Sequence, residues 1–277
     1  MAKVIICADD YAQSAAIDAA ILDLITRGVL TATSCMTLSP AWPQSAAQLS
    51  PEIRARADIG LHLDFTQFSQ TIRLSHPALV LRSLFGLLDQ RAIRDNIRQQ
   101  LDAFEQALGT PPDYVDGHLH VHQLAGIREQ LLAEMQQRYA RLPAPQRPWL
   151  RISSPPERSG LKARVIHWLG AGALRAKAEQ LGFRVSPRLL GVYDFQADAA
   201  AYQAHWLHWA RQLKQLAPAS AASLPPVLMC HPAMPAELVD ESDPIASARV
   251  IEWQVMQSAD FSTWLAQADI QPVKGSH

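Results

Sequence analysis

Short apolar runs alternate with longer stretches of helical period along most of the chain. Residues 3–8 (KVIICA) are continuously apolar after the lysine, which is typical of a strand buried on both faces. In residues 14–28 the apolar side chains recur at helical spacing, and Gly28 can end that helix. Because strands that alternate with helices usually form a parallel sheet with the helices outside it, this order predicts an α/β protein.

Further strands are predicted at residues 31–38, 58–65, 113–120, 149–152, 189–193 and 226–230. Further helices are predicted around residues 42–49, 124–141, 161–181, 199–216 and 245–268, and a helix-rich region is predicted at about residues 79–108. No linker divides the 277 residues, so we expect a single domain, residues 1–277, folded as a distorted, TIM-like (β/α) barrel of about seven parallel strands. Neither GxGxxG nor GxxxxGK(S/T) follows the first strand, which weakens a nucleotide-binding interpretation.

The composition excludes several classes of protein. Charged residues make up 18% of the chain and its formal net charge is −1, so nothing favours a nucleic-acid partner. Cys7, Cys35 and Cys230 lie far apart in apolar runs, which predicts buried free thiols. The N-terminus lacks the long apolar stretch of a signal peptide, and no run of about 18 apolar residues predicts an integral membrane segment. We therefore expect a cytoplasmic protein.

Polar residues follow four of the predicted strands at the same kind of position. Asp9 and Asp10 close the first strand, His62 lies near the end of the third, His118 ends the fourth, and His231 follows the strand at residues 226–230. In parallel α/β folds the carboxyl ends of the strands form one rim, where active sites are built. We expect these five residues to converge on one mouth.

Each of these features also has an ordinary explanation. The two aspartates can cap the next helix, His62 can be a satisfied core histidine, and the alternate-residue histidines of DGHLHVH (His118, His120 and His122) can be structural. These explanations do not account for four motifs at equivalent positions, so the combination favours a catalytic metal site.

The residue types indicate a reaction. One carboxylate and two imidazoles leave positions open on a divalent ion for water and a substrate oxygen. Asp9 and Asp10 point opposite ways on a regular strand, so both can serve one site only if the backbone turns there. One could then bind metal while the other acts as general base, and a further imidazole could protonate a leaving amine. Such a set suits hydrolysis of an amide.

The motifs ADDYA, GLHLDFT, DGHLHVH and CHPA, in this order between Val4 and about Ala233, resemble the YdjC-like carbohydrate deacetylases. That family includes chitooligosaccharide deacetylases and HpnK-like proteins of hopanoid biosynthesis. The resemblance implies a distorted (β/α) barrel, one divalent metal ion (Mg²⁺ or Zn²⁺), an N-acetylated carbohydrate substrate and a homodimer.

Matched residue by residue, the resemblance implies that Asp10, His62 and His118 bind the metal. It also implies that Asp9 activates water and that His231 is the general acid. His120 and His122 complete the histidine-rich motif, lining the site or orienting its ligands. Arg151 stands where relatives often carry an arginine, which could orient a carboxylate.

The chain departs from the family pattern where ADDFG is common and ADDYA is found. Tyr11 keeps an aromatic ring, but Ala12 removes the freedom that glycine gives the turn after the aspartates. Leu38 also stands where several relatives have asparagine. Aromatic platforms for a sugar ring could come from Tyr11 or from the other candidates, which are Trp42, Trp149 and Tyr193. The remaining histidines are interpreted as surface or helix residues: His76, His167, His205, His208 and His277.

Two alternatives stay open. Metal hydrolases of the amidohydrolase and PHP-phosphoesterase kind also use an HxH element, but they usually carry it on the first strand, where this chain has two aspartates. A non-catalytic sugar-binding protein could keep the fold, although it would have no need of a free carboxylate beside a metal.

Overall fold

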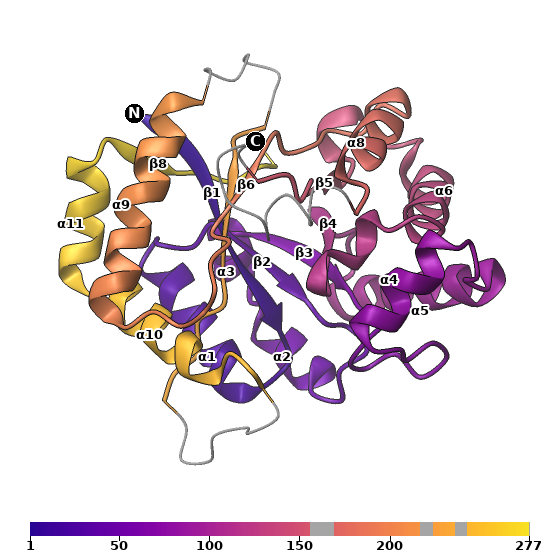
Figure 1. The fold of residues 1–277 in the computed structure, drawn as a ribbon, viewed down its shortest axis with the longest axis horizontal. Helices are drawn as coiled ribbons and strands as arrows, with labels where there is room; N and C mark the ends of the chain where they lie inside the picture. Colours follow the sequence, from indigo (N-terminus) through magenta and orange to yellow (C-terminus); the bar gives the residue numbers. More distant parts are fainter. Residues whose placement is uncertain (156–168, 217–223, 236–242, 277) are drawn as a thin grey trace.

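A computed structural model describes residues 1–155, 169–216, 224–235 and 243–276 (Figure 1). Its centre is a parallel sheet in the order β5-β4-β3-β2-β1-β7-β6, and β8 pairs with the beginning of β1. The strands are β1 Ala2–Tyr11, β2 Ala32–Cys35, β3 Asp58–Leu63, β4 Tyr114–Gly117, β5 Trp149–Leu150, β6 Leu189–Leu190, β7 Val227–Cys230 and β8 Ile270–Pro272. Seven parallel strands curl into a half-barrel, which confirms the predicted α/β architecture.

The outermost strands of the sheet, β5 and β6, are linked by contacts of irregular backbone. Leu150 of β5 forms an isolated bridge with Val185, and the backbone N–H of Leu189 in β6 donates to the carbonyl of Ser154 at 3.1 Å. These contacts replace regular pairing between β5 and β6, so the barrel is distorted.

Helices cover the outside of the sheet (Figure 1). They are α1 Ala15–Thr26, α2 Trp42–Gln48, α3 Pro51–Arg56, α4 His76–Leu84, α5 Gln90–Leu108, α6 Ile127–Tyr139, α8 Ala171–Gln180, α9 Ala199–Gln215, α10 Ala246–Met256 and α11 Ala259–Gln267. Short 3-10 helices lie at η1 His118–Gln123 and η2 Ala144–Gln146. None of the helices in the described parts of the chain is both long and apolar enough to cross a membrane.

Most of the predicted elements are found, but several differ in their bounds or were not predicted. The histidine-rich stretch leaves the sheet at Gly117 and enters η1, so β4 is shorter than expected. The helical stretch at residues 245–268 is two helices, because α10 ends at Met256 and Ser258 is the N-cap of α11. The predicted helix at residues 161–181 lies partly outside the described residues, and α8 is its described part. The eighth strand, β8, was not predicted.

β1 is buried on both faces because it lies in the middle of the sheet. Val4, Ile6 and Ala8 belong to the core between the sheet and the helices, whereas Ile5 and Cys7 face a second cluster inside the half-barrel. This two-residue alternation is that of an extended strand. All three cysteines are buried and free, as predicted.

Gly60 in β3 leaves room for an aromatic stack inside the half-barrel. A Cβ at this position would lie 2.5 Å from the ring of Tyr114, which stacks on Trp149 with 4.3 Å between ring centroids. Because the stacked ring cannot move aside, we expect Gly60→Ala to lower the free energy of unfolding by about 1–3 kcal/mol in urea titrations. Gly172→Ala is the control, since nothing lies within 4 Å of that position in α8. Equal stability of the two variants would contradict this packing argument.

Candidate active site

The backbone turns where Asp9 and Asp10 end β1. Asp10 has a φ of 69° and Ala12 a φ of 73°, and the pairing of β1 with β2 shifts register here. Short polar side chains such as aspartate tolerate this left-handed conformation better than most residues do. The Asp18 carboxylate accepts the Ala12 N–H at 2.6 Å and holds the turn. Both aspartates line one pocket as a result.

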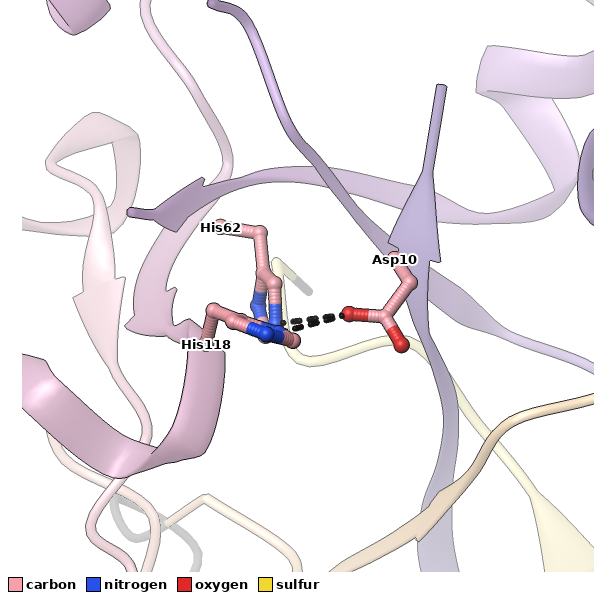
Figure 2. A group of neighbouring side chains, drawn as sticks. All are labelled: Asp10, His62 and His118. Carbon is pink, nitrogen blue, oxygen red and sulfur yellow. Dashed lines mark hydrogen bonds and ion pairs between the residues drawn. The ribbon is translucent and has the colours of Figure 1, made fainter. Parts of the chain in front are cut away.

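Asp10 faces two imidazoles that come from other parts of the sheet (Figure 2). Its Oδ1 lies 3.2 Å from Nε2 of His62, at the end of β3, and 3.0 Å from Nδ1 of His118, at the start of η1. One ligand atom from each of the three residues lies within 4.8 Å of the others. This is a group of residues that could hold a metal ion.

His62 is held by contacts on its other side. Its Nδ1 lies 2.7 Å from Oδ1 of Asp116 in β4 and 3.0 Å from Oγ of Ser34 in β2. An acceptor at Nδ1 places the ring proton there and leaves Nε2 free for a metal, as in many histidine-bound sites. Burial lowers the pKa of His62, but Asp116 and Asp9 outweigh this effect and raise it to about 10. The carboxylates around His62 therefore favour a positive charge at this position.

Asp9 forms a buried ion pair with Arg151, which follows β5. The two guanidinium nitrogens lie 2.5 and 2.8 Å from the two carboxylate oxygens, and Nη1 also lies 2.9 Å from Oδ2 of Asp116. Burial raises the pKa of Asp9, but Arg151 and His62 outweigh it and hold that pKa well below its usual range. Cys7, Asp9 and Asp116 also lie close enough to hold an ion, but the Arg151 guanidinium already contacts all three.

His231 directly follows β7. Its Nε2 is 3.9 Å from Oδ2 of Asp9, and it lines the same pocket. Burial lowers the pKa of His231 to about 4, although Asp10 and Asp9 act in the opposite direction. The imidazole of His231 is therefore neutral near pH 7.

The other two histidines of DGHLHVH, His120 and His122, lie in different surroundings in η1. Leu119 and His120 take left-handed backbone conformations, with φ of 51° and 61°. Non-glycine residues in this region are strained, and such strain clusters at functional sites. His120 lines the pocket, with its Nδ1 3.0 Å from Oγ of Ser153. His122 is fully buried, and its Nε2 donates to the Arg151 carbonyl at 2.8 Å, so it supports the backbone beside Asp9.

These residues surround a pocket of about 950 Å³. The described residues that line it beyond the predicted set are Gln13, Thr66, Gln67, Arg73, Ser75, His76, Leu119, Leu169, Val192, Phe195, Met229, Asp243, Pro244, Ile245 and Arg249. His76, interpreted from the sequence as a surface or helix residue, begins α4 and reaches this wall. The other unassigned histidines that the structure describes, His205 and His208, lie on α9.

Phe195 is the phenylalanine among the described residues that line the pocket, and the sequence did not single it out. Phe195 lies against His231, with 5.3 Å between ring centroids, and has a φ of 64°. Tyr11 is fully buried and donates its hydroxyl to the carbonyl of Ser45 at 2.8 Å. Trp42, Trp149 and Tyr193 are also buried and do not appear among the described lining residues.

Helix α10 contributes two buried charged residues that the motifs did not reveal. Nη2 of Arg249 lies 2.7 Å from Oδ2 of Asp10, and Oε2 of Glu252 accepts the backbone N–H of His231 at 2.6 Å. In the sequence both look like solvent-exposed charges on an amphipathic helix. Their three-residue spacing, which puts them on one face, is the only local signal that links them.

Glu252 should make stability depend on pH. Burial raises its pKa from 4.5 to about 7, although bonds from His231 and Tyr193 act against this. Between these values the folded protein binds the proton more tightly than the unfolded chain does. The contribution of Glu252 to stability should therefore fall as the pH rises through this window, by on the order of 3 kcal/mol. Urea unfolding between pH 5 and pH 8 measures this slope, and Glu252→Gln should flatten it. An unchanged slope in that variant would assign the pH dependence to other groups.

Comparison with known proteins gives relatives over much of the chain. A family model described as YdjC-like protein matches residues 3–267. The carbohydrate deacetylase of Mus musculus is 30% identical over 161 residues, which are 51% of this chain and 51% of that protein. The chitooligosaccharide deacetylase of Proteus mirabilis is 29% identical over 131 residues, 44% of this chain and 51% of that protein. The chain spans about half the length of the curated relatives it matches.

A solved structure shares the fold. A protein of Enterococcus faecalis V583, described as a cellobiose-phosphate cleavage protein, superposes with a TM-score of 0.71 over 98% of this chain and 97% of its own, at 17% identity. At this identity the likeness concerns the architecture alone. The family match, by contrast, covers nearly the whole sequence and includes every motif at the pocket. The chain belongs to the YdjC-like protein family.

Proposed function

We propose that the protein is a metal-dependent carbohydrate deacetylase that removes N-acetyl groups from an acetylated sugar, oligosaccharide or glycolipid. The observation that carries this proposal is the convergence of a carboxylate and two imidazoles, Asp10, His62 and His118, with a second carboxylate, Asp9, in one pocket. The names of the relatives, carbohydrate deacetylase and chitooligosaccharide deacetylase, support the same reaction.

The donor set fits one divalent ion, Mg²⁺ or Zn²⁺, held by Asp10, His62 and His118. When bound, such an ion polarises the acetyl carbonyl and lowers the pKa of water. The buried charges agree with this assignment. The carboxylates that contact the two buried guanidinium groups outnumber them by two: Asp9, Asp10, Asp116 and Asp243 against Arg151 and Arg249. Buried charges are costly unless they are paired, so a divalent cation would balance the surplus.

Asp9 is the proposed general base. Arg151 keeps its carboxylate ionised and fixes both oxygens, so Asp9 can accept a proton from the attacking water without changing its orientation. The water oxygen forms a bond to the acetyl carbon, and the bond from that carbon to the sugar nitrogen then breaks. The products are acetate and an amino sugar.

His231 is the proposed general acid. Because it is neutral in the resting site, it must gain the proton that it later donates. Its Nε2 lies 3.9 Å from Asp9, the group that receives a proton from water, so a small movement or a bridging water would connect the two. The proton then passes to the leaving nitrogen as the carbon–nitrogen bond breaks.

Acetate release tests the function. Metal-loaded protein is incubated with N-acetylglucosamine, diacetylchitobiose, longer chitooligosaccharides and N-acetylglucosaminyl lipids, with Asp9→Asn as the matched control. Acetate from the wild type alone would support the reaction and name the substrate class. Hydrolysis of a phosphate ester in place of acetate release would favour the phosphoesterase alternative, and sugar binding without any turnover would favour a binding protein.

The expected homodimer and the cytoplasmic location stay predictions.

A further inference from the structure

Arg249, in the first half of α10, lies between two carboxylates at the edge of the pocket. Its Nη2 is 2.7 Å from Oδ2 of Asp10 and its Nε is 2.6 Å from Oδ2 of Asp243. The side chains of the three residues are 4%, 2% and 8% exposed, respectively. An arginine held on two sides by buried carboxylates has little freedom to move, and removing it would leave Asp243 and Oδ2 of Asp10 without their guanidinium partner.

The contact with Arg249 fixes which carboxylate oxygen of Asp10 faces the two imidazoles. Oδ1 of Asp10 faces Nε2 of His62 and Nδ1 of His118, whereas Oδ2 is taken by the guanidinium. Without Arg249 the carboxylate could rotate and offer either oxygen to the imidazoles, and ordering it again would cost free energy each time an ion binds.

Arg249 also connects Asp10 to the walls of the pocket. Asp243 begins the wall formed by residues 243–245, and the backbone carbonyl of Arg249 accepts the N–H of Ala233 at 3.0 Å, two residues beyond His231. One residue therefore ties the end of β1, the segment after β7 and the start of α10 together.

We infer that Arg249 is a positioning residue for the metal ligand Asp10. Asp243 affects the affinity for the ion only through its contact with Arg249 and does not itself contact the ion. This inference rests on the proposed metal site. Neither residue belongs to the ligand group, so the effect of each on ion affinity has to pass along the chain of contacts from Asp243 to Arg249 to Asp10.

Calorimetric titration of metal-free protein with Zn²⁺ tests the inference without any substrate. Arg249→Gln should weaken Zn²⁺ binding by about 10- to 100-fold, as loss of a residue that orients a ligand usually does. Arg249→Lys keeps the charge but cannot hold both carboxylates, so a smaller loss is expected. Asp243→Asn should weaken binding several-fold, and Asp243→Asn combined with Arg249→Gln should bind Zn²⁺ no more weakly than Arg249→Gln alone.

The controls separate positioning from general damage. Arg98→Gln removes an arginine that pairs with buried Glu134 at 2.8 Å on α5 and α6, and it should leave Zn²⁺ affinity unchanged. Thermal unfolding shows whether each variant is folded at the titration temperature, and Arg249→Lys serves if Arg249→Gln is not. Wild-type affinity in both Arg249 variants, or additive effects of the two positions, would overturn the inference. Failure of the wild type to bind Zn²⁺, or full binding by His118→Ala, would instead overturn the metal site on which it rests.

Discussion

Asp9→Asn is expected to keep the metal ion and to lose most turnover, with kcat lower by about 10²- to 10⁴-fold. The amide has nearly the same shape as the carboxylate but cannot take a proton from water. Asp9 lies outside the ligand group of Asp10, His62 and His118, and its two oxygens are already held by Arg151. Zn²⁺ titration and acetate release, measured on the same preparation, give the two quantities.

His118→Ala is the matched comparison, because it removes a proposed ligand from the same pocket. It should lose both ion binding and turnover, whereas Asp9→Asn should lose only turnover. If Asp9→Asn also lost the ion, the division of labour between the two neighbouring aspartates would have to be reversed.

Arg151→Met should lower the free energy of unfolding by about 3–5 kcal/mol, because removing one partner of a buried ion pair leaves the other charge uncompensated. Arg151 is fully buried, and both Asp9 and Asp116 would lose their guanidinium partner. Methionine has a similar volume, so the change tests charge more than packing.

Urea unfolding at pH 7 measures this loss. The control is Arg27→Met, which breaks an exposed pair with Asp23 on α1 and should change stability by no more than about 1 kcal/mol. Similar small changes in both variants would mean that Asp9 and Asp116 find other partners, or become protonated, when Arg151 is absent.

The sequence was sufficient to predict that five residues, Asp9, Asp10, His62, His118 and His231, meet at one pocket. Parallel strands end at a common edge, so polar residues at the ends of separate apolar runs indicate one location even when the contacts are distant in sequence. His62 lies in β3 and His118 directly follows β4, yet both face Asp10. The need for a backbone turn at the two aspartates followed from the two-residue period of a strand, and Asp10 supplies it with a positive φ.

The supporting residues could not be predicted in this way. Arg249 contacts Asp10 across a separation of 239 residues, and in the sequence it looks like an ordinary surface charge on a helix although it is buried. The separate positions of His120 and His122 depend on two left-handed non-glycine residues, which the alternating pattern HLHVH does not indicate. Phe195 has no motif around it and lies at the pocket through tertiary packing alone.

The strand order has a consequence for synthesis on the ribosome. The strands β1 to β4 are neighbours both in sequence and in the sheet, so a nascent chain of about 120 residues already contains Asp10, His62 and His118. The opposite edge of β1, with its apolar run, stays unpaired until β7 and β8 have been made more than 100 residues later. An open apolar edge of this kind is prone to pair with other chains. We therefore expect translation pauses before residue 227 to favour aggregation and to increase the demand for chaperones.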